Sequence, residues 1–331
     1  AALAAGCPVV LKGHPAHPGT GEIIAQAIAR AMKATDQHPG VFSFLQGSTH
    51  EVGAQVVQHP LIRAVGFTGS LAGGRALFDL CMNRSEPIPF FGELGSVNPM
   101  FCLPQAMQTR AVALAQGWAA SLTMGAGQFC TNPGIAFVIA GAQANEFAEA
   151  SIAALSVAGA QAMLTDGIAA AYRHGANAVA SAVHVEPLFT TESVGRTALP
   201  NLFRISMEHW LRSPDLQNEV FGPFGIIVEA NDLDEMVAAA GAIEGQLTCT
   251  LQMEEGDKAH AKRLLPHLER KAGRVLVNGF PTGVEVAGAM VHGGPYPAST
   301  NFGATSVGTM AIRRFLRPVC YQNMPADLLP V

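Results

Sequence analysis

The sequence has 331 residues, of which 49% are hydrophobic and 14% are charged, and its net charge is −5. This composition supports a sizeable folded core and argues against a disordered chain, a basic nucleic-acid-binding surface and a helical membrane span. The six cysteines are scattered without a Cys-x-x-Cys pair. That pattern argues against a zinc cluster or a disulfide framework and favours the reducing cytoplasm.

The first residues, 1–6, contain neither Met nor the charged segment typical of a signal peptide. They resemble the C-terminal end of a helix that terminates at Gly6, and the apolar residues 8–11 follow. We therefore expect the chain to be a piece of a longer protein.

Strands and helices alternate through the first 90 residues. Apolar residues at Ile23, Ile24, Ala27 and Ile28 have helical spacing, and short apolar runs between the helices predict buried strands. This alternation predicts parallel strands with right-handed crossovers, the pattern of a nucleotide-binding sheet. The predicted strands are 8–12, 41–45 and 64–67, and the predicted helices are 20–33, 50–58 and 70–82.

A second α/β unit is predicted after residues 87–93. It contains a Gly-rich loop at 125–133, a long loop rich in Gly, Pro, Ser and Thr at 283–308, and a strand-like tail at 317–322. Its other predicted strands are 100–103, 135–139, 225–229, 248–251 and 275–278, and its helices are 106–122, 144–155, 233–242 and 258–270.

Cys130 lies in the Gly-rich loop among the small and polar residues Gln128, Thr131 and Asn132. A loop before a secondary-structure element gives a cysteine nucleophile access to substrate and offers backbone N–H groups to an oxyanion. The alternative is a free cysteine packed as a small hydrophobe, which is our interpretation of the other five cysteines.

Glu93 follows the apolar run 87–92 and is an isolated carboxylate at the end of a predicted strand. Open α/β sheets bind ligands at such strand ends. Partial burial would raise the pKa of Glu93 toward the range of a general base. The alternative is an ordinary carboxylate at the end of a strand.

Four further residues are candidates for binding a nucleotide. Gly69 and Ser70 join a predicted strand to a predicted helix, whose N-terminus favours phosphate. The glycines there do not form the Gly-x-Gly-x-x-Gly fingerprint. Lys12 and Glu219 are suited to contact a ribose or a phosphate, and the alternative for both is a solvated surface position. The histidine pattern predicts no metal site.

Six short motifs, taken in order, resemble the aldehyde dehydrogenase superfamily over nearly the whole chain. Each motif is weak alone, but their order and spacing make the resemblance specific. The final stretch, 292–322, is similar to the branch with 2-oxoglutarate semialdehyde (2,5-dioxopentanoate) dehydrogenases and a long-chain fatty aldehyde dehydrogenase. The motifs are Val10-Leu-Lys12, Gly66-Phe-Thr-Gly-Ser70, Phe91-Gly-Glu-Leu-Gly-Ser-Val-Asn-Pro99, Gly127-Gln-Phe-Cys130, Glu219-Val-Phe-Gly-Pro223 and Gly273-Arg-Val-Leu-Val-Asn278.

This resemblance implies an α/β fold with a Rossmann-type cofactor domain and an α/β catalytic domain. The cofactor domain would take residues 1–92 and lack its upstream part, and the catalytic domain would take 93–292. Residues 293–331 would return to the cofactor domain. A strand around 319–322 would join the sheet of a neighbouring subunit in a homodimer or homotetramer.

The resemblance also implies a reaction. Cys130 attacks the aldehyde carbon to give a thiohemiacetal, a hydride leaves for the nicotinamide, and Glu93 activates the water that hydrolyses the resulting thioester. The implied cofactor-binding residues are Lys12 at the adenosine ribose, Gly69 and Ser70 at the pyrophosphate, and Glu219 with Phe221 at the nicotinamide ribose.

NADP is the expected cofactor and NAD the alternative, because Pro15 stands where NAD-preferring members often have an acid. The expected substrate is 2,5-dioxopentanoate, which would give 2-oxoglutarate, and a long-chain fatty aldehyde is the alternative. Arg173, Arg196 and Arg204 are candidates for binding the substrate carboxylate by availability alone.

Two functions of other kinds remain open from the sequence: a cofactor-independent cysteine acyl-transfer or esterase enzyme, and an inactive truncated relative. The family's oxyanion hole uses an Asn side chain upstream of the motif that contains Lys12, in a region that we expect this chain to lack. Losing one oxyanion donor costs about 100- to 1000-fold in rate. We therefore expect activity to depend on upstream residues, with no nucleic-acid or membrane partner.

Overall fold

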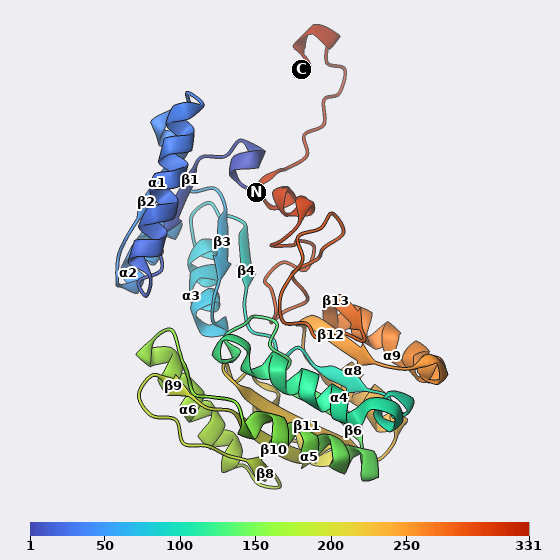
Figure 1. Cartoon of the computed structure of the whole chain (residues 1–331). Helices are drawn as coiled ribbons and strands as arrows, with labels where there is room; N and C mark the ends of the chain where they lie inside the picture. The colour runs from blue at the N-terminus through green and yellow to red at the C-terminus, as the bar shows by residue number, and fades with distance from the viewer. Residues whose placement is uncertain (331) are drawn as a thin grey trace.

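The structure, a computed structural model, describes residues 1–330. In its N-terminal part, parallel strands alternate with helices as predicted, and the strands form two separate two-stranded sheets. Figure 1 shows these elements above the larger sheet that follows. They are, in chain order, β1 (Val9–Lys12), α1 (Pro18–Ala34), β2 (Phe42–Leu45), α2 (His50–Gln58), β3 (Val65–Thr68), α3 (Leu71–Met82) and β4 (Phe90–Glu93).

Local signals in the sequence explain where these helices begin and end. The 3₁₀ turn η1 (Leu3–Ala5) ends at Gly6, whose φ of 77° lies in the left-handed region that glycine tolerates. Helix α1 begins at a proline, whose fixed φ suits the first helical position. Ser70 caps α3, because its hydroxyl accepts the N–H of Gly73 at 3.2 Å.

A seven-stranded sheet lies at the centre of the larger part of the molecule (Figure 1). All of its strand pairs are parallel except the one at the β8 edge. In spatial order the strands are β13 (Ala272–Val277), β12 (Gln246–Gln252), β5 (Met100–Cys102), β6 (Ile135–Ile139), β11 (Phe224–Ala230), β10 (Asn201–Ser206) and β8 (Glu186–Phe189).

Helices cover both faces of this sheet, and neighbouring residues of one strand belong to opposite cores. Met100 joins the core under α4 and α5, together with Trp118 and Phe147. Phe101 joins the core on the other face, where Trp210 is also fully buried. The helices are α4 (Pro104–Thr123), α5 (Ala142–Ser156), α6 (Asp166–Ala180), α7 (Met207–Leu211), α8 (Leu233–Ala242) and α9 (Lys258–Lys271).

Most of the predicted elements are present, and the main omission is the stretch from 161 to 211. It contains α6, α7, β8, β10 and a small antiparallel pair, β7 (Gln161–Ala162) with β9 (Thr197–Ala198). Strands β7, β8 and β9 have at most four residues each, and β8 carries a proline, so their apolar periodicity is weak. Among the described residues, no helix is both long and apolar enough to span a membrane.

The C-terminal part returns to the smaller sheets. Residues 283–308 are mostly loop, as predicted, and they pack along β4: the N–H of Leu94 donates to Ala298, and that of Thr300 to Gly92. A 3₁₀ helix, η6 (Thr309–Phe315), follows. The predicted strand at 317–322 is absent from the described chain. Val319 and Tyr321 are exposed there, and pairing with a neighbouring subunit stays a prediction.

Candidate active site

Cys130 lies between the 3₁₀ helix η3 (Met124–Gly127) and β6, in a loop held by a buried asparagine. The side-chain amide of Asn98 donates to the carbonyl of Cys130 at 2.9 Å and to that of Asn132 at 3.0 Å. Asn98 has a φ of 48°, in the left-handed region that asparagine tolerates better than most residues. The backbone at Cys130 and just after it is therefore held in place.

Gln246, the first residue of β12, anchors the same region to the large sheet. Its side-chain Oε1 accepts the backbone N–H groups of Val97 and Asn98 and the hydroxyl of Ser96, at 2.9 to 3.0 Å. Full pairing of these buried groups avoids the cost of unsatisfied polar atoms. The loop that follows Glu93 and the loop that carries Cys130 are thus part of one network.

Glu93 is the last residue of β4, and only 7% of its surface is exposed. Ser306 donates its hydroxyl to Oε2 of Glu93 at 2.6 Å, and Nε2 of His292 lies 2.9 Å from Oε1. Both partners come from the loop that returns after β13. The carboxylate is therefore buried, held at both oxygens and oriented toward the Cys130 loop.

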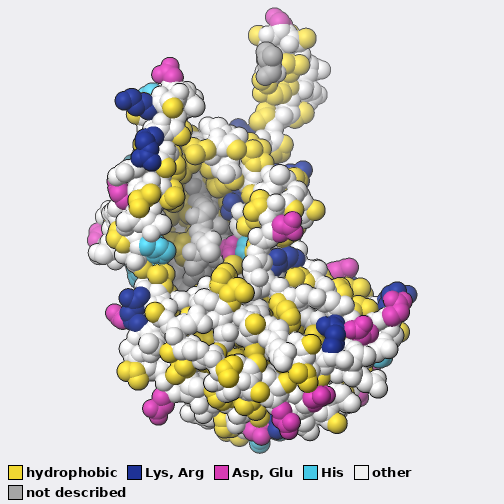
Figure 2. Space-filling view, in the orientation of Figure 1, with side chains coloured by type: hydrophobic (Ala, Val, Ile, Leu, Met, Phe, Trp, Pro, Cys, Tyr) yellow, Lys and Arg dark blue, Asp and Glu magenta, His cyan; other side chains and the backbone are white. Residues whose placement is uncertain are grey.

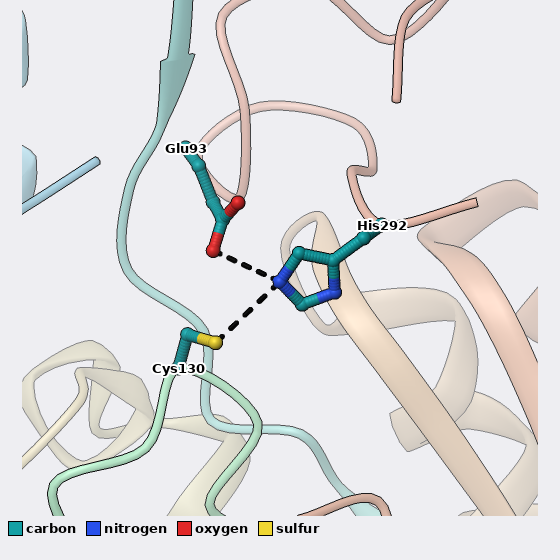
Figure 3. Close-up of side chains that lie close together, drawn as sticks. All are labelled: Glu93, Cys130 and His292. Carbon is teal, nitrogen blue, oxygen red and sulfur yellow. Dashed lines mark hydrogen bonds and ion pairs between the residues drawn. The ribbon is translucent and has the colours of Figure 1, made fainter. Parts of the chain in front are cut away.

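His292 brings Glu93 and Cys130 together. Its Nε2 atom lies 3.4 Å from Sγ of Cys130 as well as next to Glu93, as Figure 3 shows. The reactive atoms of the three side chains all lie within 4.8 Å of one another. The sequence predicted Cys130 and Glu93 but assigned no role to His292 or Ser306, although both lie in the segment 292–308 that carried part of the family resemblance.

The electrostatics of Glu93 correct one expectation. Burial by itself would raise the pKa of this carboxyl, but the hydrogen bonds and charge interaction with His292 and the hydrogen bond from Ser306 outweigh it, so the pKa is lowered. The sequence suggested the opposite direction because it does not show these two donors. Glu93 is thus an ionised carboxylate near neutral pH.

The pKa of the Cys130 thiol is shifted upward, in the direction opposite to that of Glu93. Burial, followed by the negative charge of Glu93 and its hydrogen bond, raises the pKa of Cys130 to about 12. A nearby carboxylate opposes formation of a second negative charge. Without further stabilisation of the thiolate, this thiol is therefore protonated at neutral pH.

The residues predicted to bind the cofactor lie at strand ends near this cluster. Lys12 ends β1, and Gly69 and Ser70 join β3 to α3. The N–H of Gly69 donates to the backbone carbonyl of Glu93 at 3.1 Å, so the turn before α3 lies directly beside the general-base candidate. A Cβ on Gly69 would lie 2.7 Å from the ring of Phe67, so a larger residue there would have to displace that ring.

Glu219 and Phe221 lie in the loop before β11 and line a small pocket with Gly127 and Asn132 of the Cys130 region. Oε2 of Glu219 is also close to Gly95, where an added Cβ would lie 3.1 Å away. Desolvation by the groups around it raises the pKa of Glu219, and a hydrogen bond with the backbone of Ser96 opposes the rise.

These positions fit an anionic dinucleotide. The first turn of α3 leaves backbone N–H groups free for a phosphate, and Lys12 forms no ion pair among the described residues. Figure 2 shows a hollow between the part that carries α1 and the part that follows β13, with charged and histidine side chains at its floor. Space and charge therefore both suit such a ligand.

The three arginines proposed for the substrate are engaged elsewhere. Arg204 pairs with Glu186 and Glu229, Arg196 donates to the carbonyl of Met163, and Arg173 donates to the carbonyl of Gly195. The cations whose charge acts on the site are instead Arg274 of β13, which interacts with Cys130, and Arg314 of η6, which interacts with Glu93.

Comparison with known proteins assigns the family. The model described as "Aldehyde dehydrogenase family" matches residues 1–183. The chain belongs to the aldehyde dehydrogenase family. The resemblance predicted from the sequence motifs is thereby confirmed.

Among curated aldehyde dehydrogenases, the chain is 49% identical to alpha-ketoglutaric semialdehyde dehydrogenase 2 of Azospirillum brasilense over 331 residues. It is 47% identical to alpha-ketoglutaric semialdehyde dehydrogenase of Acinetobacter baylyi over 337 residues. These alignments cover 99% and 100% of this chain, and the chain spans 63% of the length of either relative. Both names agree with the branch suggested by residues 292–322.

Solved aldehyde dehydrogenase structures confirm the predicted α/β fold. The gamma-glutamyl-gamma-aminobutyraldehyde dehydrogenase of Burkholderia cenocepacia has a TM-score of 0.78 at 22% identity, covering 95% of this chain and 62% of that one. Aldehyde dehydrogenase C of Pseudomonas syringae has a TM-score of 0.79 at 20% identity, covering 95% and 63%.

Proposed function

We propose that the chain carries the catalytic centre of an NAD(P)-dependent aldehyde dehydrogenase that oxidises 2,5-dioxopentanoate to 2-oxoglutarate. The observation that carries this proposal is the cluster in which the buried Glu93 and His292 and the half-buried Cys130 bring their reactive atoms within 4.8 Å. A thiol next to a carboxylate suits covalent capture of an aldehyde followed by hydrolysis. The two curated relatives support the choice of substrate.

In the proposed mechanism, Cys130 binds the aldehyde carbon through Sγ and forms a thiohemiacetal. NAD(P), when bound, supplies the hydride acceptor that turns this adduct into a thioester on Cys130. Glu93 then accepts a proton from a water molecule, which attacks the thioester and releases the acid. The hydrogen bonds from Ser306 and His292 keep Glu93 ionised and oriented for that step.

We further propose that Lys12, Gly69 and Ser70 bind the adenosine ribose and pyrophosphate, and that Glu219 and Phe221 bind the nicotinamide ribose. The open first turn of α3 and the cation at the end of β1 support the first assignment. NADP is preferred over NAD in this proposal, because Pro15 offers no carboxylate to repel a 2′-phosphate and Lys12 attracts one.

The proposed domain division keeps the sequence-based boundaries: 1–92 for the cofactor, 93–292 for catalysis and 293–331 for the return to the cofactor domain. The two small sheets end with Glu93, and the seven-stranded sheet uses residues from Met100 to Val277, which supports the first boundary. A homodimer or homotetramer and a cytoplasmic location stay predictions.

The substrate and the cofactor are tested together by the absorbance of reduced nicotinamide. We expect the rate with 2,5-dioxopentanoate and NADP to exceed the rates with succinate semialdehyde, with long-chain aldehydes and with NAD. Ester hydrolysis without cofactor, and no reduced nicotinamide with any aldehyde, would instead indicate a cysteine esterase. The 331-residue chain is assayed beside an upstream-extended chain, because we expect an oxyanion donor upstream.

The nucleophile is tested by Cys130→Ala, with Cys320→Ala as the matched control because Cys320 is exposed and is not a member of the cluster. Turnover should disappear in the first variant and stay unchanged in the second. Substantial turnover by a folded Cys130→Ala protein contradicts the proposed mechanism.

A further inference from the structure

His292 has a role that the proposed mechanism leaves unassigned. Its Nε2 atom faces two possible hydrogen-bond acceptors, Oε1 of Glu93 at 2.9 Å and Sγ of Cys130 at 3.4 Å (Figure 3). An ionised carboxylate only accepts hydrogen bonds, so the hydrogen must be on Nε2. Nδ1 is buried without a hydrogen-bond partner among residues 1–330, so the hydrogen bonds of the ring are those at Nε2.

The imidazole is rigidly placed. Only 4% of the surface of His292 is exposed, and its backbone N–H donates to the hydroxyl of Thr305 at 2.8 Å. Ser306 donates to the carbonyl of His292 at 3.1 Å and to Glu93 at 2.6 Å. These contacts hold Nε2 at the midpoint of the cluster, where a small shift of one hydrogen changes its acceptor from oxygen to sulfur.

Cys130 needs such a donor. Burial and the charges of two carboxylates oppose its ionisation, and the cations near the cluster are themselves half-buried and bonded to other groups. A buried anion is stable only when it is paired or hydrogen-bonded. The titratable and charged groups that face Cys130 or its partners are Glu93 of β4, His292 of the returning loop, Glu219 of the loop before β11, Arg274 of β13 and Arg314 of η6.

We propose that His292 is a catalytic residue that holds the Cys130 thiolate by donating its Nε2–H to Sγ. The S–H bond breaks and the thiol proton passes to a water molecule of the solvent, so the carboxylate of Glu93 stays ionised. The Nε2–H, released from Oε1, then turns to the sulfur. The imidazole neither gains nor loses a proton in this step, and no electrons are exchanged. This role rests on the proposed function, since it activates the nucleophile of that reaction.

The test measures the thiolate directly, with neither aldehyde nor cofactor. Iodoacetamide alkylates the 331-residue chain at a series of pH values, and mass spectrometry of peptides gives the rate at each cysteine. His292→Ala removes the donor, whereas His292→Gln keeps an N–H₂ group in place of Nε2–H. Cys320, which is exposed, is the internal standard, and slow alkylation of the fully buried Cys249 shows that the fold is retained.

We expect His292→Ala to slow alkylation of Cys130 by about tenfold or more at pH 8, with the pH profile displaced upward, because hydrogen bonds to charged groups shift ionisation by about one pKa unit or more. His292→Gln should stay within about threefold of the unsubstituted chain. Unchanged alkylation in His292→Ala overturns the proposal.

An equal decrease in the rate of Cys130 alkylation in both His292 variants also overturns the proposal, since that result requires an imidazole that takes up the thiol proton. If His292→Ala does not fold, His292→Gln still shows whether His292 donates a hydrogen bond to the sulfur or accepts the thiol proton. Failure of the proposed function appears elsewhere, as absent nicotinamide reduction with normal alkylation.

Discussion

At the scale of single residues, the hydrogen bonds from His292 and Ser306 to Glu93 support its proposed role in the hydrolytic step. Glu93→Gln keeps the size of the side chain but removes the proton acceptor. We expect the active protein to release about one equivalent of reduced cofactor in a burst and then to slow by about 10²- to 10⁴-fold, because the thioester is no longer hydrolysed. Rapid-mixing absorbance measures both phases.

The control for that experiment is Glu86→Gln, because Glu86 is an exposed carboxylate in an ion pair with Arg63. It should leave both phases unchanged, since exposed pairs contribute little. A steady state in Glu93→Gln as fast as in the unsubstituted protein would assign hydrolysis to another group.

Glu93 also makes stability depend on pH. Its pKa is lower in the folded chain than in the unfolded one, so its contribution to stability is present above the unfolded value of about 4.3 and is lost as the pH falls through the folded pKa. Urea unfolding at pH 6 and pH 3.5 should therefore show a smaller loss of unfolding free energy in Glu93→Gln. An equal decrease in unfolding free energy in both proteins would show that the partners of this carboxylate do not stabilise its ionised form in the folded chain.

Arg274 is the residue that we expect to distinguish an acidic substrate from an apolar one. Its guanidinium is half-buried, its charge acts on Cys130, and its Nε has no partner in the part of the chain described. Arg274→Met should raise KM for 2,5-dioxopentanoate by about tenfold or more, the effect of losing a charged hydrogen bond, and leave KM for a neutral aldehyde nearly unchanged. An equal increase in KM for both substrates would contradict this assignment.

At the scale of elements, the Cys130 loop depends on close backbone approach. Gly127 has a φ of 67°, and a Cβ there would lie 2.2 Å from the backbone of Gly222. Gly127→Ala should lower the free energy of unfolding by about 2 kcal/mol or more, from strain and from collision with atoms that have little room to move. Chemical denaturation measures this loss.

Gly159→Ala is the matched control, because nothing lies within 4 Å of its added Cβ and its φ is ordinary. We expect a change within about 0.5 kcal/mol there. A similar small change at Gly127 would show that the loop is looser than its packing indicates.

The elements with strong periodicity were predictable from sequence. The helical spacing around Ile23 and the apolar run 135–139 correspond to α1 and β6. In contrast, β8 and β10 are defined by pairing with strands that are near in space, which local pattern does not report.

The same distinction holds for the site. Motif order and spacing predicted Cys130 and Glu93. His292 and Ser306 reach them only because the loop after β13 folds back along β4. The direction of the Glu93 pKa shift was wrong for that reason, since its donors come from a distant part of the chain.

At the scale of the whole molecule, stability is unevenly distributed. The central strands β5, β6 and β11 are almost wholly buried between two cores, whereas α1 contains no buried residue and β1 and β2 form only a two-stranded sheet. Isolated strand pairs are marginally stable. Amide hydrogen exchange should therefore be fastest through residues 9–58 and slowest in those central strands. Uniform protection along the chain would contradict this gradient.

The convergence of Glu93, Cys130 and His292 also makes the thiol a reporter of assembly. Its carboxylate partner ends the small sheet, the thiol belongs to a loop of the large sheet, and the imidazole arrives on the returning segment. The local chemistry of Cys130 therefore exists only after all three regions have docked. Pulses of a thiol reagent during refolding would measure when that docking occurs, even in a chain that turns over no substrate.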